Sequence, residues 1–553
     1  MYKRQPSNGP KTSSGITVNA SLTKNTTGPI KGGTEVEIFG TNFKSLKVIP
    51  VLFGQPGSTD IKIVSDTKIT ATSPATSTPG PVNIAVVNGK GKHLSAGTFT
   101  YETPPNNGVP MEFKPKDAAN TYVQFVGSTS FDAYYYNQAG VKESIVQNKG
   151  YCLADMISTT PVVDGAPVGL PTLMVKAMSG RVYLSFGSAI PGISTNIPNA
   201  ADSSVDSVYQ YFEATVKDST ITTDLSYIDF TAFTLSLIGK KAPNGSNLHQ
   251  VSSSTKDLVT AAAGSALTKN GSVLPKAADM YPSNKFLRVI SPQLGESGLY
   301  HDFTYYIHDF LQGKSIRLAG IYTGNGTQPT GNPLTQIQTY DYTGIFKTSK
   351  DPTTSEITGG ITLTPSSDSG NGSANGIKTK DQGQGVGHTN ADIVITFKDL
   401  NKNVGAYGCN AAYTAAGVSY DGIKNDFYGQ VVGDLLSALN FGYAGSTKEY
   451  TDSNGNRAEL GTMQSTQWWG GHLLDGTHLL TADSPGGQGI YFEKVQSDVR
   501  CYNSYAASIS TLTTGYGFPF QDRLGANLLS LSTSTDQDAY VQVWVDEVPV
   551  TDF

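Results

Sequence analysis

Short strand-like segments separated by turn residues constrain the fold of this chain more than any other feature. Between residues 16 and 101, runs of about four to seven strand-forming residues alternate with Gly, Pro and Asn turns about every eight to twelve residues, a spacing typical of a small β-sandwich. Composition agrees, because the 553 residues include 60 Gly and 29 Tyr, whereas only 15% are charged. We therefore expect a mainly β protein.

The length of the chain predicts more than one domain. Residues 103–110 are rich in Pro, Gly and Asn, as in a linker. We expect a disordered leader over 1–15, a β-sandwich domain over 16–102, this linker, and a larger module over 111–553. Within that module, the Gly-, Ser-, Thr- and Asp-rich residues 351–390 are expected to form a loop or hairpin excursion.

The larger module begins with strands and then changes its periodicity. Apolar side chains recur at helical spacing in residues 301–314 and 426–442, which predicts two helices, and residues 501–512 are a third candidate. Strands return near the end, notably in residues 539–547. We interpret this module as a β-sandwich with an inserted or appended α/β part.

Charge and cysteine content exclude several classes of protein. The net charge is −6 and no run of Lys or Arg occurs, which argues against a nucleic-acid partner. We expect no membrane span, because no stretch of about 18 residues is apolar. The first residues lack the apolar core of a signal peptide. Cys152, Cys409 and Cys501 have no zinc-site spacing, so we expect no metal and no cofactor, while one disulfide or none stays open.

Two acidic residues on neighbouring predicted strands form the sharpest candidate site. Glu213 and Asp229 flank a polar connection, and a hairpin centred near Ile221 would place them opposite each other on one sheet face. Glycoside hydrolysis uses such a pair, since one carboxyl protonates the leaving oxygen while the other activates water or attacks the sugar. Two ordinary surface acids, or a slipped register that turns them to opposite faces, are the alternatives.

The segments around these acids carry a family resemblance. Residues 179–187 (SGRVYLSFG), 204–216 (SVDSVYQYFEATV) and 223–237 (TDLSYIDFTAFTLSL) resemble glycoside hydrolase family 64, in this order. The spacing of 16 residues (229 − 213) between the two acids matches the pattern of that family. Weaker similarity continues downstream, so that the resemblance covers roughly residues 111–550, in the segments VVGDLLSALNFG (431–442), NSYAASI (503–509) and YGFPFQD (516–522).

The resemblance implies a β-1,3-glucanase with a thaumatin-like sandwich and an additional α/β domain that together form a wide groove. It implies endo-acting, inverting hydrolysis that releases short oligosaccharides, with Glu213 as general acid and Asp229 as general base. Thr215 falls on a groove-lining position, and Asp224 and Tyr227 are further candidates for substrate binding. The implied partner is β-1,3-glucan, such as laminarin, curdlan or a fungal or algal wall glucan. We expect a secreted monomer.

Three positions depart from the family pattern. Asp224 stands where the family usually has Asn, and Phe441 stands where an Arg is common. A His that is common in the family is absent around Ile509. Each departure can alter contacts with substrate, but none removes the acid or the base.

The N-terminal sandwich carries a resemblance of its own. Its turn and strand residues are similar to the IPT/TIG domain, an immunoglobulin-like fold, at Gly28–Pro29, Gly32–Thr34, Gly40–Phe43, Pro81–Val82 and Phe99–Tyr101. The resemblance implies a spacer or binding module and not a catalyst.

Weaker candidates and two other functions stay open. The pair Trp468–Trp469 could stack on sugar or pack in the interior, whereas His301 and His308 with their neighbouring aspartates do not give a closed set of metal ligands. One alternative function is a non-catalytic, thaumatin-like protein that binds glucan or cell walls. The other is a surface adhesin in which both parts of the chain form a rod.

Overall fold

The computed structural model describes residues 15–29, 32–45, 49–58, 60–76, 80–88, 91–102, 108–157, 169–193, 207–240, 248–266, 288–294, 298–323, 337–366, 391–424, 426–468, 470–476, 492–521, 528–533 and 539–546. Their contacts divide the chain into two compact units, Met1–Asn107 with Ser532–Asp538, and Gly108–Leu531 with Ala539–Phe553. The expected leader, except residue 15, and residues 103–107 of the expected linker lie outside the described residues.

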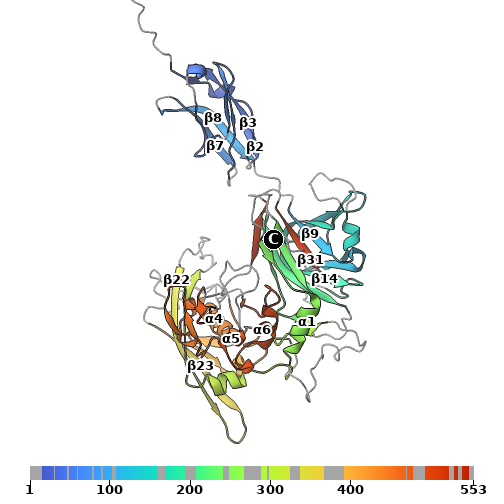
Figure 1. Ribbon diagram of the computed structural model, residues 1–553, viewed down its shortest axis with the longest axis vertical. Helices are drawn as coiled ribbons and strands as arrows, with labels where there is room; N and C mark the ends of the chain where they lie inside the picture. Colours follow the sequence, from blue (N-terminus) through green and yellow to red (C-terminus); the bar gives the residue numbers. More distant parts are fainter. Residues whose placement is uncertain are drawn as a thin grey trace, which may run out of the picture. The chain divides into compact units, whose positions relative to one another are not determined.

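The first unit is a sandwich of two four-stranded sheets (Figure 1). One sheet has the order β1 (Thr17–Val18), β3 (Glu35–Thr41), β6 (Lys68–Thr72), β5 (Ile61–Ile63), and the other has the order β2 (Thr27–Pro29), β8 (His93–Glu102), β7 (Gly80–Val87), β4 (Val51–Phe53). Alternate residues of these strands are buried between the sheets, among them Ile38, Ile69 and Phe99. The alternation of buried and exposed residues confirms the expected small β-sandwich.

The second unit begins with a twelve-stranded sheet that bends around one long strand, β14 (Thr172–Phe186). The first half of β14 pairs with β9 and β11, and its second half pairs with β10 and β15. The remaining strands of the sheet pair in turn with these. Besides β14, the twelve strands are β9 (Val109–Pro115), β10 (Thr121–Val126), β11 (Asp132–Tyr136), β12 (Lys142–Ser144), β13 (Tyr151–Cys152), β15 (Tyr209–Lys217), β16 (Thr220–Leu225), β18 (Leu235–Lys240), β19 (Leu248–Gln250), β30 (Leu529–Ser532) and β31 (Tyr540–Val545). Buried side chains of these strands contribute to one apolar core.

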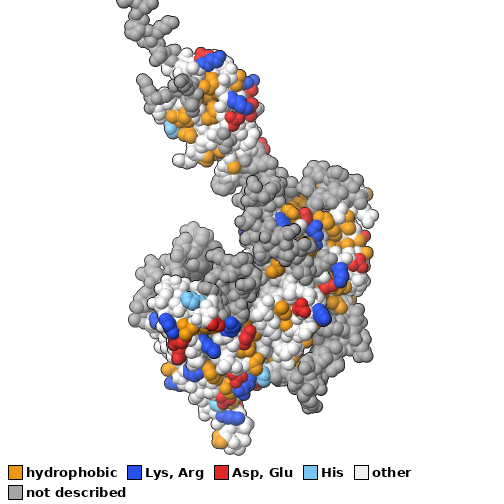
Figure 2. All heavy atoms as spheres, in the orientation of Figure 1, with side chains coloured by type: hydrophobic (Ala, Val, Ile, Leu, Met, Phe, Trp, Pro, Cys, Tyr) orange, Lys and Arg blue, Asp and Glu red, His pale blue; other side chains and the backbone are white. Residues whose placement is uncertain are grey.

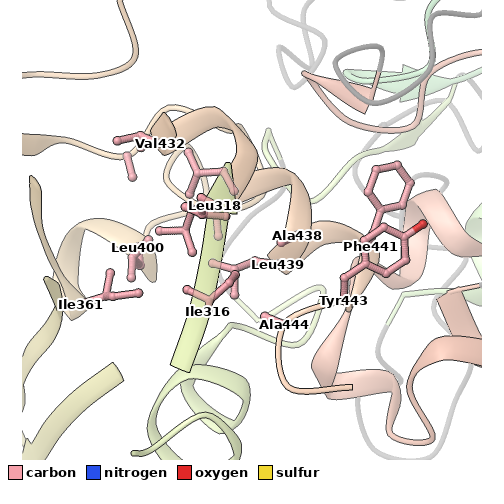
Figure 3. Packing of buried hydrophobic residues seen from close by; sticks show 14 of the residues in the cluster. Ile316, Leu318, Ile361, Leu400, Val432, Ala438, Leu439, Phe441, Tyr443 and Ala444 are labelled. Carbon is pink, nitrogen blue, oxygen red and sulfur yellow. The ribbon is translucent and has the colours of Figure 1, made fainter. Parts of the chain in front are cut away.

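The helical part of the second unit is built on a second sheet. Six antiparallel strands follow one another in it, β21 (Ser315–Thr323), β22 (Ile337–Lys350), β23 (Ile357–Pro365), β24 (Ile393–Thr396), β25 (Tyr413–Ala415) and β26 (Val418–Tyr420). Helix α4 (Phe427–Phe441) packs on it, with Leu439 beside Ile316 of β21 (Figure 3). Asp426 caps the start of α4 by accepting from the Gly429 amide at 2.7 Å, and Gly442, with φ 82°, ends it.

The remaining elements are short. They are the strands β17 (Phe230–Thr231), β20 (Val289–Ile290), β27 (Glu449–Thr451), β28 (Arg457–Glu459) and β29 (His472–Leu473), the helices α1 (Thr255–Gly264), α3 (Phe397–Leu400), α5 (Phe492–Val495) and α6 (Ser504–Ser510), the 3-10 turns Ala20–Leu22, Phe43–Ser45, Ala118–Asn120, Leu153–Met156, Leu460–Thr462, Ser465–Gln467 and Val499–Cys501, and the π-helix Tyr305–Phe310. Helix α1 contacts α6, which links the helical part to the first sheet of this unit (Figure 1).

Most elements expected from periodicity are present. The predicted helices over 426–442 and 501–512 contain α4 and α6, and the predicted closing strand contains β31. The predicted helix over 301–314 is a π-helix whose inner side chains Tyr306 and Ile307 are buried. Together with the two β-rich units, this confirms the expected mainly β fold with a helical part. The thaumatin-like relationship and the wide groove remain predictions.

The first part of the expected loop or hairpin excursion is a hairpin. Residues 357–365 form β23, which pairs antiparallel with β22, and Ile361 and Leu363 are buried while Thr362 and Thr364 are exposed. The later part of the expected excursion, 367–390, lies outside the described residues.

The described surface carries charges of both signs, and the cysteines are thiols rather than disulfides. Figure 2 shows Lys and Arg side chains intermingled with Asp and Glu over the described part of the face that it draws. All three cysteines are free thiols, and Cys409 and Cys501 are buried. Within the described residues, no helix has the length and the apolar character that crossing a membrane requires.

Candidate active site

The strands β15 and β16 form a tight hairpin that carries Glu213. Its turn is Asp218–Ser219, and both residues have a left-handed φ, 50° and 64°, as in a type I′ turn. This turn pairs Lys217 with Thr220 and Glu213 with Asp224. The expectation that the hairpin centres near Ile221 and that Asp229 lies opposite Glu213 was therefore wrong. The two-residue turn shifts the pairing by five residues, so β16 ends before Asp229.

Side chains on one face of three neighbouring strands form rows across the sheet. Arg181 of β14 is in register with Glu213 of β15, which is in register with Asp224 of β16. Two residues along each strand lies a row of hydroxyls, Ser179, Thr215 and Thr222. These six residues line a cavity of about 420 Å³. The structure thus places the predicted residues Glu213, Thr215 and Asp224 in one cavity.

Arg181 joins the two predicted catalytic acids. Its Nε donates to Glu213 Oε1 at 3.0 Å, and its Nη1 donates to Asp229 Oδ2 at 2.7 Å. The side chain of Arg181 is only 15% exposed, compared with 40% for Glu213 and 12% for Asp229. Although Glu213 and Asp229 are not cross-strand partners, one guanidinium brings both carboxylates to the same place.

Asp229 is held by further donors. Tyr211 Oη donates to Asp229 Oδ2 at 2.7 Å, and Gln293 Nε2 donates to Oδ1 at 2.5 Å. Its backbone carbonyl accepts from the Ser291 amide at 3.0 Å. Every oxygen of this buried residue therefore has a partner, which is what a desolvated carboxylate requires.

Helix α6 fixes the segment on both sides of Asp229. Tyr505 Oη donates to the carbonyl of Tyr227 at 2.8 Å and lies 2.7 Å from Thr231 Oγ1. Next to it, β17 pairs with β20, with Phe230 opposite Ile290. The position of Asp229 thus depends on Tyr505 of α6, which lies 278 residues beyond Tyr227 in the chain.

Burial and charge keep the neighbouring groups in defined protonation states. Burial raises the pKa of Tyr211 well above its ordinary value, and the charge of Asp229 adds to that effect. Burial likewise raises the pKa of Tyr183 to about 12. Burial opposes the charge of Arg181, but the carboxylates of Asp229 and Glu213 beside it help to outweigh burial and raise the pKa of Arg181. Tyr211 therefore remains a neutral hydrogen-bond donor and Arg181 remains a cation.

Other residues singled out in the sequence lie away from this cavity. Tyr227 is 1% exposed, and its hydroxyl contacts Ser252 Oγ at 2.9 Å inside the core, which does not agree with a substrate contact. Trp468 is buried and its Nε1 donates to the Met463 carbonyl, as expected for packing, whereas Trp469 lies outside the described residues. Phe441 is fully buried against Tyr443 and Phe518. Among the residues that the structure describes, no cluster of His, Cys, Asp and Glu could hold a metal ion.

Sequence reasoning missed three residues of the site, Arg181, Tyr211 and Gln293. A signal for two of them was present, because Arg181 lies within SGRVYLSFG and Tyr211 lies two residues before Glu213, on the same face of a strand. Gln293 had none, since it lies 64 residues beyond Asp229 and reaches the site only through the fold.

Comparison with known proteins gives two family matches. Residues 114–313 match the family model of glycoside hydrolase family 64, described as β-1,3-glucanase, and residues 21–101 match the IPT/TIG domain. No curated protein sequence matches the chain significantly.

Similar solved structures are remote in sequence. A laminaripentaose-producing β-1,3-glucanase in complex with laminaritetraose is 13% identical, with a TM-score of 0.40 and coverage of 80% of this chain and 99% of that one. A β-1,3-glucanase domain from Clostridium beijerinckii is also 13% identical, with a TM-score of 0.39 and coverage of 80% and 100%. A laminaripentaose-producing β-1,3-glucanase from Paenibacillus barengoltzii is 15% identical, with a TM-score of 0.23 and coverage of 51% and 78%.

Proposed function

We propose that this chain, in which an IPT/TIG domain precedes a segment of the β-1,3-glucanase family 64, hydrolyses β-1,3-glucan at the cavity over β14, β15 and β16. The observation that carries the proposal is the convergence of Glu213 and Asp229 on the guanidinium of Arg181, a residue that lines the cavity together with Glu213. Two carboxyl groups at one site are the minimum that glycoside hydrolysis requires.

The surroundings of the two acids favour different roles. Asp229 is buried and accepts hydrogen bonds from Arg181, Tyr211 and Gln293, which suits an oriented carboxylate that acts as general base on water. Glu213 is 40% exposed and lines the cavity, where it can reach the oxygen of a bound glycosidic bond as general acid.

We further propose that hydrolysis inverts the anomeric centre. Inverting enzymes hold their carboxyl groups about 6.5–9.5 Å apart so that a water fits, whereas retaining enzymes hold them about 5–5.5 Å apart. Glu213 and Asp229 bind different nitrogens of Arg181, Nε and Nη1. This arrangement supports a pair of carboxyl groups that are held apart, as direct attack by water requires.

Substrate contacts and cellular location complete the proposal. Thr215 and Asp224 line the cavity beside Glu213 and would bind sugar hydroxyls. We infer endo action on long chains, with the release of short oligosaccharides. Because a polymer of this kind lies outside cells, the enzyme would be secreted, and it would act as a monomer.

The test is release of sugar from laminarin and curdlan. We expect Glu213→Gln and Asp229→Asn each to lose about 100- to 10,000-fold in kcat, as when a general acid or base is removed. Asp218→Asn is the matched control, because it removes one charge from the exposed turn of the same hairpin. Equal sugar release by the wild type and both site variants would exclude these roles.

Two further measurements separate the alternatives. Binding of laminarin without release of sugar by the wild type would favour a non-catalytic glucan-binding protein. Proton NMR of the first product reports its anomeric form, and an initial β-anomer would exclude inversion.

A further inference from the structure

Beyond the two acids, we propose that Arg181 is a positioning residue that sets the separation of Glu213 and Asp229 and orients the carboxylate of Asp229. The inference rests on the proposed function, because it assigns Arg181 a role in that reaction. It concerns a residue that does not itself exchange a proton with the substrate.

The first argument is the shape of the guanidinium. Its nitrogens form a rigid planar fork, so two carboxylates that bind different nitrogens are held at a fixed distance and angle. Nε binds Glu213 at 3.0 Å and Nη1 binds Asp229 at 2.7 Å. A lysine ammonium is a point charge on a flexible stem and cannot impose this geometry on both acids.

The second argument is that Arg181 is itself fixed. It belongs to β14, and its backbone is in register with Glu213. The sheet therefore fixes the position of the Arg181 backbone relative to that of Glu213. Its guanidinium carbon lies 4.2 Å from the centre of the Tyr211 ring, and its side chain is 15% exposed. The ring of Tyr211 supports the guanidinium, while its hydroxyl donates to the same Asp229 oxygen.

The third argument is charge. In the described part of the site, Arg181 is the cation that binds both Glu213 and Asp229, and a third acid, Asp224, lies across the hairpin from Glu213. Without that cation, the acids would repel one another and Asp229 would lose one of its three side-chain donors. We therefore expect loss of Arg181 to displace the two acids relative to each other, with little direct effect on how sugar is bound.

The test is steady-state kinetics on laminarin with Arg181→Met and Arg181→Lys. A displacement of about 1 Å at a reacting centre can lower the rate about 100-fold. We expect a loss of kcat of this size in Arg181→Met, with a KM within about 2-fold of the wild type, and a smaller but clear loss in Arg181→Lys. Free guanidinium, far below denaturing concentrations, should restore part of the kcat of Arg181→Ala.

The matched control is Arg317→Met. Arg317 is also a strand residue, and it binds both oxygens of Asp341 at 2.9 and 2.6 Å, on the six-stranded sheet. Its loss should leave kcat unchanged, so a fall in both variants would point to general destabilisation and overturn the inference.

Three other outcomes would overturn it. They are an Arg181→Met variant with both kcat and KM unchanged, an Arg181→Met variant with unchanged kcat and a raised KM, which would make Arg181 a substrate-binding residue, and a folded Arg181→Lys with full activity. If the wild type releases no sugar at all, the proposed function fails, whereas an active wild type with an equally active Arg181→Met defeats this inference alone.

Discussion

Glu213 lies directly across the β15–β16 hairpin from Asp224, and both side chains line the same cavity. On its other side, Glu213 is in register with Arg181 of β14, to which it is hydrogen-bonded at 3.0 Å. One acid thus has a cation on one neighbouring strand and a second acid on the other. Like charges directly opposite each other in a sheet are destabilising, so this arrangement has a cost to folding.

We expect Asp224→Asn to stabilise the second unit. Removal of one of two opposed like charges should raise the free energy of unfolding by about 0.5 kcal/mol, and the gain should shrink in high salt because salt screens the repulsion. Denaturant unfolding at low and high salt measures both effects. Asp218→Asn removes the same charge from the turn, and an equal gain there would show that net charge, not the opposed pair, is responsible.

The fold could be predicted from sequence wherever the signal is local. The small sandwich, α4 and β31 follow from turn spacing, from helical periodicity between Asp426 and Gly442, and from strict alternation in the last strand. The sequence predicts the hairpin of Glu213 but not its register. The turn is the two-residue Asp218–Ser219, and periodicity alone does not distinguish it from a longer connection centred near Ile221.

The site could be predicted only in part, for a related reason. Glu213, Thr215 and Asp224 share a hairpin, so a local pattern with a family resemblance was enough to find them. The contacts of Asp229 with Gln293, and of its flanking residues with Tyr505, join segments that are 64 and 278 residues apart. Nothing in a single sequence links such positions, and Tyr227, which belongs to the same local pattern, faces the core.

Tyr505 is expected to support activity from a distance. Tyr505→Phe removes the hydroxyl that contacts the Tyr227 carbonyl and Thr231 Oγ1 and leaves both buried groups without this partner. We expect a loss of about 1–2 kcal/mol in stability and a fall of several-fold in kcat at unchanged KM, because Asp229 lies between the two contacts. Thermal unfolding and kinetics on laminarin test this. Tyr122→Phe on β10 is the control, and an equal effect there would argue against a specific role.

Glu112 gives the second unit a pH-dependent stability. Burial raises the pKa of this carboxyl on β9, an effect that the Gln542 hydrogen bond and Lys114 oppose only partly. Between the ordinary pKa of a glutamate and this raised value, the folded chain binds more protons than the unfolded chain. Stability therefore falls as the pH rises through that window.

Replacement of Glu112 by a neutral residue should accordingly raise the stability of the second unit at neutral pH. We expect Glu112→Gln to stabilise the unit by about 1 kcal/mol at neutral pH, where the buried carboxyl is charged in the parent chain. The gain should vanish at acidic pH, where the carboxyl is neutral in the folded and the unfolded chain alike. Denaturant unfolding across this pH range measures it, with Glu143→Gln on the exposed strand β12 as control. A gain that does not depend on pH would contradict this explanation.

Phe441 shows how a departure from a family pattern can be built into a core. Its ring stacks on Tyr443 at 5.2 Å and meets Phe518 edge-on at 4.9 Å, and the residue is fully buried at the end of α4 (Figure 3). In this chain the side chain at position 441 therefore serves packing. An arginine there, which is common in the family that the chain resembles, would place an uncompensated charge in the apolar core. We expect Phe441→Arg to destabilise the unit by about 3–5 kcal/mol, and Phe441→Leu by only about 1–2 kcal/mol. Thermal unfolding of the two variants tests this, and a stable Phe441→Arg with unchanged or higher activity would mean that position 441 can still turn toward the substrate.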